Sequence, residues 1–326
     1  MTPDQTEFAG YVATLGRGPG RSRALTRDEA RAAFAMALQQ RADPHQVGAF
    51  LMLLRYRGED RDEITGLVEA ARADIGVTGL VADLDWPSYG AGRTRGAPWF
   101  LLAALTLARA GTRVFMHGSN AFSAGVSVAV ALAELGLSPA EGIEAAQRQL
   151  ATDRFAYLPI NVLSPAMARL LDMRPLFGLR SPVNTVARLL DPANAAAGVD
   201  GVFHPAYLDV HLGVAERMAR PALLVLKGGG GEAERNPSKP AAAHVWREGH
   251  GRTELTLPAL QIDGQDAAST GGAAGEFAAV WRGTATPPRP VATVVATIAL
   301  ALLTLGQAGA PEQADALAAQ LWHDRH

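Results

Sequence analysis

Residues 81–118 read VADLDWPSYGAGRTRGAPWFLLAALTLARAGTRVFMHG, and this stretch decides the class of fold. An apolar segment at 81–89 runs into a glycine-rich turn, and an apolar helical segment at 97–111 ends in glycine. A second short apolar segment follows at 112–118, and another helical pattern occupies 123–136. Strands that alternate with helices at this spacing predict a parallel sheet covered on both faces.

The residues before this stretch predict helices alone. Apolar positions recur at helical spacing in 24–38, 43–58 and 60–76. Thr26 stands at the start of the first segment and Glu29 follows three residues later, which is the pattern of a capping box. Because the connections between these segments are short, we expect the helices to pack on one another.

The rest of the chain adds strands and closing helices. An apolar strand at 220–231 enters a run of four glycines. Residues 251–260 are typical of an edge strand, because Pro258 cannot donate a hydrogen bond in the centre of a sheet. Helices are expected at 291–305 and 311–322. The predicted fold class is α/β, with a small helical-bundle domain and a larger α/β domain whose mostly parallel sheet is covered by helices.

The composition excludes several classes of function. The 326 residues are enough for about two domains. The chain has no cysteine, which excludes disulfides, thiol nucleophiles and zinc–thiolate sites, and no G-x-S-x-G motif supports a serine hydrolase. The longest apolar run, at 291–305, has 15 residues and is shorter than the roughly 20 that span a bilayer. The amino terminus lacks the apolar core of a signal peptide, so we expect a soluble, cytoplasmic protein with no membrane partner.

The basic residues are almost all arginines. Among the 30 Lys and Arg residues only Lys227 and Lys239 are lysines, and the net charge of −2 creates no general attraction for nucleic acid. Arginine offers forked donors that suit phosphate oxygens, although codon usage alone also explains such a bias.

Three loops follow the carboxyl ends of predicted strands, at 88–96, 116–123 and 227–240. In open α/β sheets, ligands collect at this edge, so we expect the loops to line one cleft. Arg93 and Arg95 precede a helix, whose first amides already favour an anion. The alternative is that both are solvated loop residues.

Further candidates lie on the same loops. Lys227 stands between an apolar strand and four glycines, which suits phosphate binding, and Arg235 and Lys239 would extend this basic path. Tyr89 is placed to stack on a base beside the arginines. His117 ends a short strand, where a buried histidine with a satisfied hydrogen bond is the competing interpretation.

Four segments in the same order resemble the anthranilate phosphoribosyltransferase family, glycosyltransferase family 3. These are the helical stretch from residue 24, VFMHGSNAFSAGVSVAVALAELGL (114–137), MRPLFGLRSPVNTVARLLDP (173–192) and LVLKGGGGEAE (224–234). The resemblance implies a helical domain of 1–77 with about 163–192 and an α/β domain of 78–162 with about 193–326. It also implies a cleft for phosphoribosyl diphosphate and a dimer formed through the helical domain.

The chain departs from the family at the diphosphate-binding residues. The family's Gly-Thr-Gly-Gly-Asp loop falls on 88–92, where the aspartate is missing. Side-chain donors are replaced by Pro98, Phe100 and Leu101, and Met116 replaces a lysine. The acidic pair that binds magnesium falls on Ala233 and Glu234. The residues that do match the family include Gly90, Gly118, Ser123, His117, Arg174, Asn184 and Glu234. Since electrostatics dominates this chemistry, we expect the family's transferase activity to be absent or changed.

A second branch of the family, TrpD-like paralogues of the YbiB type, is similar at SYGAGR (88–93) and KGGGGE (227–232). This resemblance implies a homodimer that binds nucleic acid without sequence preference, with no cofactor. The expected nucleic-acid-binding residues are then Arg93, Arg95, Lys227, Arg235, Lys239, Tyr89 and Gly90. A vestigial substrate cleft would comprise His117, Ser123, Arg174 and Glu234. The alternative is a family 3 enzyme that acts on a small phosphorylated sugar, with Arg93 and Arg95 in place of magnesium.

Overall fold

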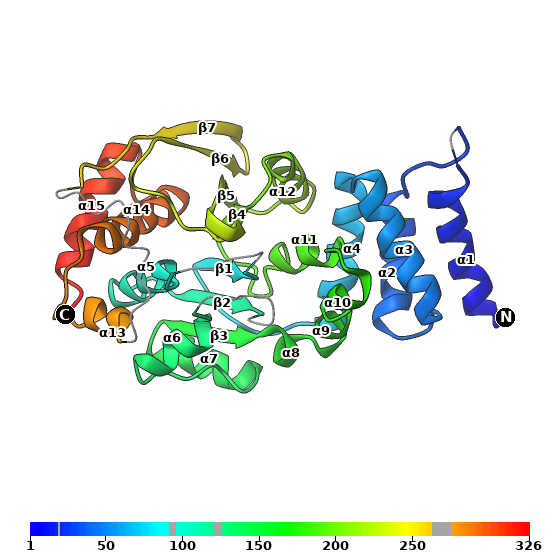
Figure 1. The fold of residues 1–326 in the computed structure, drawn as a ribbon, viewed down its shortest axis with the longest axis horizontal. Helices are drawn as coiled ribbons and strands as arrows, with labels where there is room; N and C mark the ends of the chain where they lie inside the picture. Colours follow the sequence, from blue (N-terminus) through cyan, green and yellow to red (C-terminus); the bar gives the residue numbers. More distant parts are fainter. Residues whose placement is uncertain (19, 91–95, 120–125, 263–274) are drawn as a thin grey trace.

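The computed structural model describes residues 1–18, 20–90, 96–119, 126–262 and 275–326 (Figure 1). Its centre is a sheet of seven described strands in the order β3-β2-β1-β4-β5-β6-β7. The first five strands are parallel and the last two antiparallel, which confirms the predicted α/β class. The strands are β1 (Leu84–Ser88), β2 (Val114–Gly118), β3 (Phe155–Pro159), β4 (Ala197–Val202), β5 (Ala222–Lys227), β6 (Ala241–Arg247) and β7 (Gly251–Leu257).

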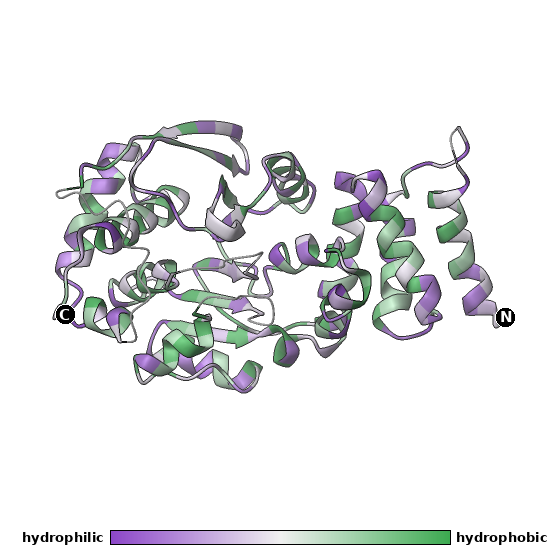
Figure 2. Ribbon diagram, viewed as in Figure 1, coloured by the Kyte–Doolittle hydropathy of each residue, from purple (hydrophilic) through white to green (hydrophobic). Residues whose placement is uncertain are grey.

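The strand predicted at the sheet edge is confirmed as β7, and Pro258 follows directly after its last residue. Side chains of the parallel strands alternate between two hydrophobic cores. Phe115 of β2 belongs to one core, whereas Val114 and Met116 belong to the other. Both faces of the sheet are therefore covered, as the apolar composition of these strands requires (Figure 2).

The amino-terminal helices form a bundle at one end of the molecule (Figure 1). They are α1 (Pro3–Gly16), α2 (Arg27–Leu38), α3 (Pro44–Arg57) and α4 (Arg61–Ile75). Each begins with a capping box, including the predicted pair Thr26 and Glu29. Helices α2 and α4 lie close together because Gly66 has no side chain. A Cβ atom there would lie 2.2 Å from the carbonyl oxygen of Arg27.

Four short helices follow β3, and two of them, α9 and α11, contact the bundle. The four are α8 (Ile160–Leu163), α9 (Pro165–Leu171), α10 (Arg174–Phe177) and α11 (Val183–Arg188). Helix α9 contacts α2, and α11 contacts both α4 and β1. This segment therefore lies between the bundle and the sheet, where Figure 1 shows α10 and α11.

The remaining helices cover the sheet. Helix α14, the longest apolar run of the sequence, packs on α5, β4 and β5, while α12 packs on β5 and on α4 of the bundle. The predicted helix at 123–136 begins only at Val128, because Ser127 caps it. The covering helices are α5 (Trp99–Arg109), α6 (Val128–Glu134), α7 (Ile143–Thr152), α12 (Ala206–Arg217), α13 (Glu276–Trp281), α14 (Pro288–Thr304) and α15 (Pro311–His323). No helix in the described ranges is long and apolar enough to cross a membrane.

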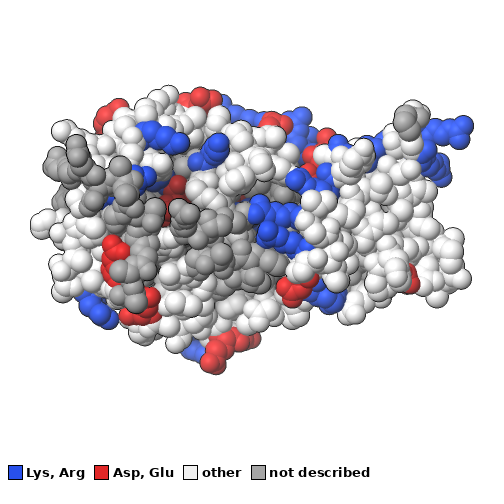
Figure 3. Space-filling model, viewed as in Figure 1, with Lys and Arg blue, Asp and Glu red and all other residues white. Residues whose placement is uncertain are grey.

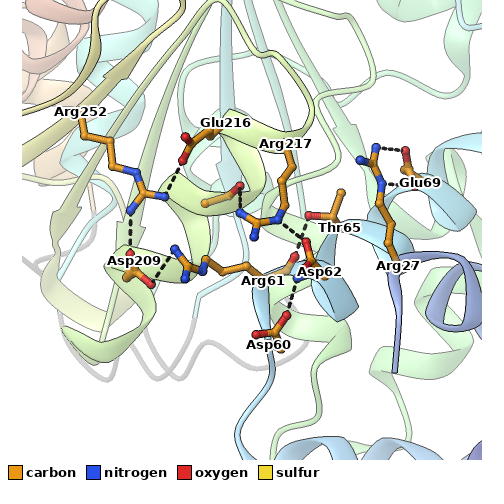
Figure 4. A network of polar contacts seen from close by, with 11 residues as sticks. Arg27, Asp60, Arg61, Asp62, Thr65, Glu69, Asp209, Glu216, Arg217 and Arg252 are labelled. Carbon is orange, nitrogen blue, oxygen red and sulfur yellow. Dashed lines mark hydrogen bonds and ion pairs between the residues drawn. The ribbon is translucent and has the colours of Figure 1, made fainter. Parts of the chain in front are cut away.

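Ion pairs join the bundle to α12 (Figure 4). Asp62 of α4 pairs with Arg217 of α12, and Arg61 lies 3.7 Å from Asp209. Arg252 of β7 donates to the same Asp209 at 2.7 Å and thereby extends the network to the sheet edge. These contacts fix the distance between the two parts of the chain and so the shape of the space between them.

Candidate functional site: an arginine-lined cleft

The parallel strands end at one edge of the sheet, as the sequence predicts. Ser88 of β1 pairs with Gly118 of β2, and Val202 of β4 pairs with Lys227 of β5. The loop after β1 touches the loop after β5, because the amide of Gly90 donates to the carboxylate of Glu232. Two of the three predicted loops therefore meet at this edge, which is the usual place for a ligand.

The carboxylates in the loop after β5 accept hydrogen bonds from backbone amides that would otherwise be available to bind a diphosphate. Glu232 accepts from Gly90, and Glu234 accepts from the amide of Phe100 at 3.0 Å, in the first turn of α5. Amides at a helix start are the natural anion donors of such a site. Ala233 between the two glutamates offers no ligand atom. The residues at 233–234 therefore do not fit the magnesium–diphosphate complex that the resemblance implies. Among the described residues no group of three or more His, Asp or Glu side chains could hold a metal.

Tyr89 and His117 are buried partners of each other. Tyr89 is only 3% exposed, and its hydroxyl lies 2.8 Å from Nδ1 of His117. The other ring nitrogen of His117 lies 3.3 Å from Asp85, which also accepts from Arg220. Burial raises the pKa of Tyr89 well above its ordinary value, so the phenol stays protonated. The prediction that Tyr89 stacks on bases is corrected by this burial. His117 is buried, as its competing interpretation expects, but its Nε2 atom has no hydrogen-bond partner among the described residues.

The prediction that Arg235 extends a basic path is likewise corrected. Its side chain is fully buried and forms an ion pair with Asp315 of α15 at 2.6 Å. This ion pair links the loop after β5 to the carboxyl-terminal helix α15. Lys227 and Lys239 are exposed, as a phosphate contact would require. Arg93, Arg95 and Ser123 lie outside the described residues.

A hollow with a cavity volume of about 90 Å³ lies between the bundle and the carboxyl end of β4. We call it the arginine cleft. Its wall includes Arg55 of α3, Arg188 of α11 and residues of α12, and Figure 3 shows Lys and Arg side chains gathered on this face. The side chains that bear on its chemistry are Arg55, Arg180, Asn184, Arg188, Tyr207 and His211.

The arginines of the cleft repel one another. Partial burial lowers the pKa of Arg180, and so do the charges of Arg174, Arg188 and Arg55. Arg180 forms no ion pair with any carboxylate in the described part of the chain. Arg174, one of the residues expected in the vestigial substrate cleft, therefore lies near enough for its charge to act on Arg180.

Two of these cations are fixed by the fold. Arg55 lies 3.8 Å from Glu59 and also contacts the hydroxyl of Tyr207, which donates to Glu59 at 2.9 Å. Burial and the charge of Glu59 raise the pKa of Tyr207 to about 12. Arg188 donates through Nη1 to the carbonyl oxygens of Gly201 and Gly231, at 3.1 and 2.6 Å. Its Nη2 atom is buried and has no hydrogen-bond partner among the described residues.

Arg180 and Arg188 were not among the residues predicted from the sequence, although both lie in the segment 173–192 that carries the resemblance. Asn184 and Arg188 are four residues apart in α11, which places them on one side of that helix, and Arg180 precedes its start. Arg55 and Tyr207 join them only through tertiary contacts between distant elements.

A helical bundle set against the carboxyl edge of a mostly parallel sheet defines a two-part α/β protein, with a cationic cleft at the edge where ligands usually bind. The chain matches two models of one family. The glycosyl transferase family helical bundle domain matches residues 10–74, and the family's α/β domain matches residues 100–324. The protein therefore belongs to the glycosyl transferase family that includes the anthranilate phosphoribosyltransferases.

Relatives and solved structures agree with this assignment. The anthranilate phosphoribosyltransferase of Rhodopseudomonas palustris is 31% identical over 91% of this chain and 89% of its own length. That of Rhizobium etli is 36% identical over 56% of this chain, which spans 55% of that relative. The crystal structure of the Thermus thermophilus enzyme aligns with a TM-score of 0.80 at 24% identity, covering 98% of this chain and 95% of that one. The Saccharomyces cerevisiae enzyme in complex with PRPP and Mg aligns with a TM-score of 0.76 at 16% identity, with 98% and 94% coverage.

Proposed function

We propose that the arginine cleft binds the phosphate of a phosphorylated sugar and that the protein transfers the glycosyl group of this substrate. The observation that carries the proposal is the buried Nη2 atom of Arg188, which has no partner among the described residues and belongs to a residue of the cleft wall. Buried polar groups almost always have a hydrogen-bond partner. The charge of Arg188 faces Asp200 at 3.5 Å, but the hydrogens of its Nη2 atom have no acceptor among the described residues. An anion in the cleft supplies that partner.

The shape of the cationic group favours a compact ligand. Arg188 is 6% exposed, so only a group that enters the cleft reaches it. Arg180 stands beside it with its charge uncompensated by any described carboxylate, and guanidinium groups bind phosphate through paired donors. A basic strip that serves nucleic acid consists of exposed cations, whereas these cations converge on a hollow.

In the transfer reaction, negative charge develops on the leaving phosphate, which the arginines of the cleft face. The bond between the anomeric carbon and a phosphate oxygen breaks, and the phosphate leaves with the bonding electrons. The acceptor forms a new bond to the same carbon and loses its proton. Arginines that face the leaving phosphate stabilise its developing charge, which is the main requirement of this chemistry. The relatives' names support a glycosyl-transfer activity, and the misfit at Ala233 and Glu234 supports a route that needs no magnesium there.

The test is a thermal-unfolding series in EDTA. Inorganic phosphate, ribose 1-phosphate and phosphoribosyl diphosphate are added to wild type, to Arg180→Ala and to Arg148→Ala, an exposed arginine of α7 that serves as control. We expect at least one sugar phosphate to raise the Tm of wild type and of Arg148→Ala but not of Arg180→Ala. Equal shifts in all three proteins, or shifts that appear only with magnesium, would overturn the proposal.

A second candidate function is nucleic-acid binding by a homodimer. Exposed Lys227 at the carboxyl end of β5 and exposed Lys239 favour it, because they lie outside the arginine cleft on the β5 loop. Binding through phosphates weakens steeply with salt. A fluorescent oligonucleotide that binds wild type at low salt, and is lost with Lys227→Ala, would support this candidate. Affinity that does not change between low and moderate salt would exclude it.

The homodimer itself remains a proposal, supported by exposed apolar side chains on the bundle. Tyr56 at the end of α3 is 90% exposed and Leu176 of α10 is 84% exposed. Between them Phe177 packs on Gly48 of α3, so the two exposed side chains belong to one packed unit. Light scattering on wild type and Leu176→Asp distinguishes a dimer from a monomer.

A further inference from the structure

A buried aspartate–histidine pair lies at the wall of the arginine cleft. Asp200 is in β4, two residues before the strand ends, and His211 is in the second turn of α12. Nδ1 of His211 lies 2.5 Å from Oδ2 of Asp200, and the two side chains are 2% and 1% exposed. His211 is also one of the residues that line the cleft.

The carboxylate fixes which ring nitrogen carries the proton. Asp200 already accepts from the amide of Gly201 at 2.7 Å and faces Arg188 at 3.5 Å through Oδ1, so it is held as an acceptor. Its other oxygen, Oδ2, requires a donor, and Nδ1–H of His211 is that donor. In a neutral imidazole the remaining nitrogen, Nε2, then has an available lone pair. Nothing in the proposed phosphate binding uses this atom.

We infer that His211 is the proton acceptor of the transfer reaction, with Asp200 as its positioning residue. The inference rests on the proposed function of the same cleft. In the step, the acceptor's O–H or N–H gives its proton to Nε2 of His211, and the electron pair of that bond forms the new bond to the anomeric carbon. The phosphate leaves with the electrons of the broken C–O bond. Asp200 stabilises the imidazolium that results.

The other charged and titratable groups at the cleft wall come from every element around it. They are Arg55 of α3, Tyr89 after β1, Arg180 and Arg188 at α11, and His204 and Tyr207 at α12. Asp200 is the carboxylate that contacts the imidazole of His211, and a phosphate dianion in the cleft pairs with the arginines instead.

The experiment is imidazole NMR of the ¹⁵N-labelled full chain at pH 7.5, with His211 assigned by its loss in His211→Gln. We expect Nδ1 protonated and Nε2 unprotonated, and we expect the Nε2 signal to move when ribose 1-phosphate is added. His45 is the matched control, since its Nδ1 also faces an aspartate, Asp43 at 2.9 Å, but its side chain is 98% exposed. The signal of His45 should not respond.

The failures of the two proposals are distinguishable. His211→Gln should keep the shift in Tm with ribose 1-phosphate, because the arginines bind the phosphate. If the wild type shows no shift in Tm with any phosphate ligand, the proposed function fails, whatever the tautomer of His211. If the shift is present but Nε2 of His211 is protonated, or its signal ignores the bound ligand, the inference about His211 is overturned and the proposed function stands.

Discussion

The guanidinium of Arg188 lies 3.5 Å from the buried carboxylate of Asp200, and Asp200 in turn holds His211. The cation and the base of the arginine cleft therefore share one carboxylate. Because α11, β4 and α12 each contribute one of the three residues, the contact depends on how the bundle-facing helices meet the sheet. The ion pairs between α4 and α12 maintain that arrangement.

Replacing Asp209 by asparagine should weaken the network that joins α12 to α4 and β7. The change removes the partner of both Arg61 and Arg252. Since the side chain of Asp209 is 62% exposed, we expect a loss of only about 0.5 kcal/mol of unfolding free energy, in low salt. Urea unfolding at 0.05 and 1 M NaCl measures it, and the difference should shrink in high salt. A salt-independent loss would show that the side chain acts through packing instead.

Gly66→Ala should destabilise the bundle. The new Cβ atom would lie 2.2 Å from the backbone oxygen of Arg27, so α2 and α4 must separate, at a cost of about 1–3 kcal/mol. Gly10→Ala is the control, because α1 leaves open space around that position and alanine favours helix by about 1 kcal/mol. Chemical unfolding should thus move in opposite directions for the two variants, and a neutral Gly66→Ala would refute the close packing.

The capping box of α2 should make stability fall in acid. The hydrogen bond from Arg23 lowers the pKa of Glu29 from 4.5 to about 2, which means that folding favours the carboxylate. The stabilisation is fully present above pH 4.5 and is lost as the pH falls toward 2. Carboxyl NMR titration of Glu29 checks the value. In Glu29→Gln, unfolding free energy should lose this part of its dependence between pH 5 and 2, and an unchanged dependence would assign it to other groups.

Arg235→Ala should lower the free energy of unfolding without changing the binding of phosphate ligands. Its removal leaves Asp315 without its buried partner, and such changes cost about 3 kcal/mol or more. Lys239→Ala on the same loop is exposed and should change unfolding free energy little. Thermal unfolding of both variants decides the matter. If Arg235→Ala is stable but binds phosphate ligands more weakly, Arg235 contributes to anion binding after all.

Local patterns predicted the elements well because each has a local cause. The capping box at Thr26 and Glu29 fixes the start of α2, and alternating apolar segments fix β1 and β2. The burial of a loop residue was harder to predict from the sequence. Arg235 lies in a polar loop, as exposed arginines often do, yet it is buried because it pairs with Asp315, eighty positions later. The arginine cleft forms where α3, α11 and α12 come together, and only tertiary packing determines how these distant elements lie.

Arg180 and Arg188 are proposed to bind the phosphate of a sugar substrate. Isothermal titration calorimetry of ribose 1-phosphate in EDTA tests this binding most directly, with wild type, Arg180→Ala and the Arg148→Ala control. We predict saturable one-site binding to wild type and to Arg148→Ala, and at least a tenfold weaker Kd for Arg180→Ala, which corresponds to about 1.4 kcal/mol. Equal affinity of wild type and Arg180→Ala, or no binding by wild type, would contradict the account.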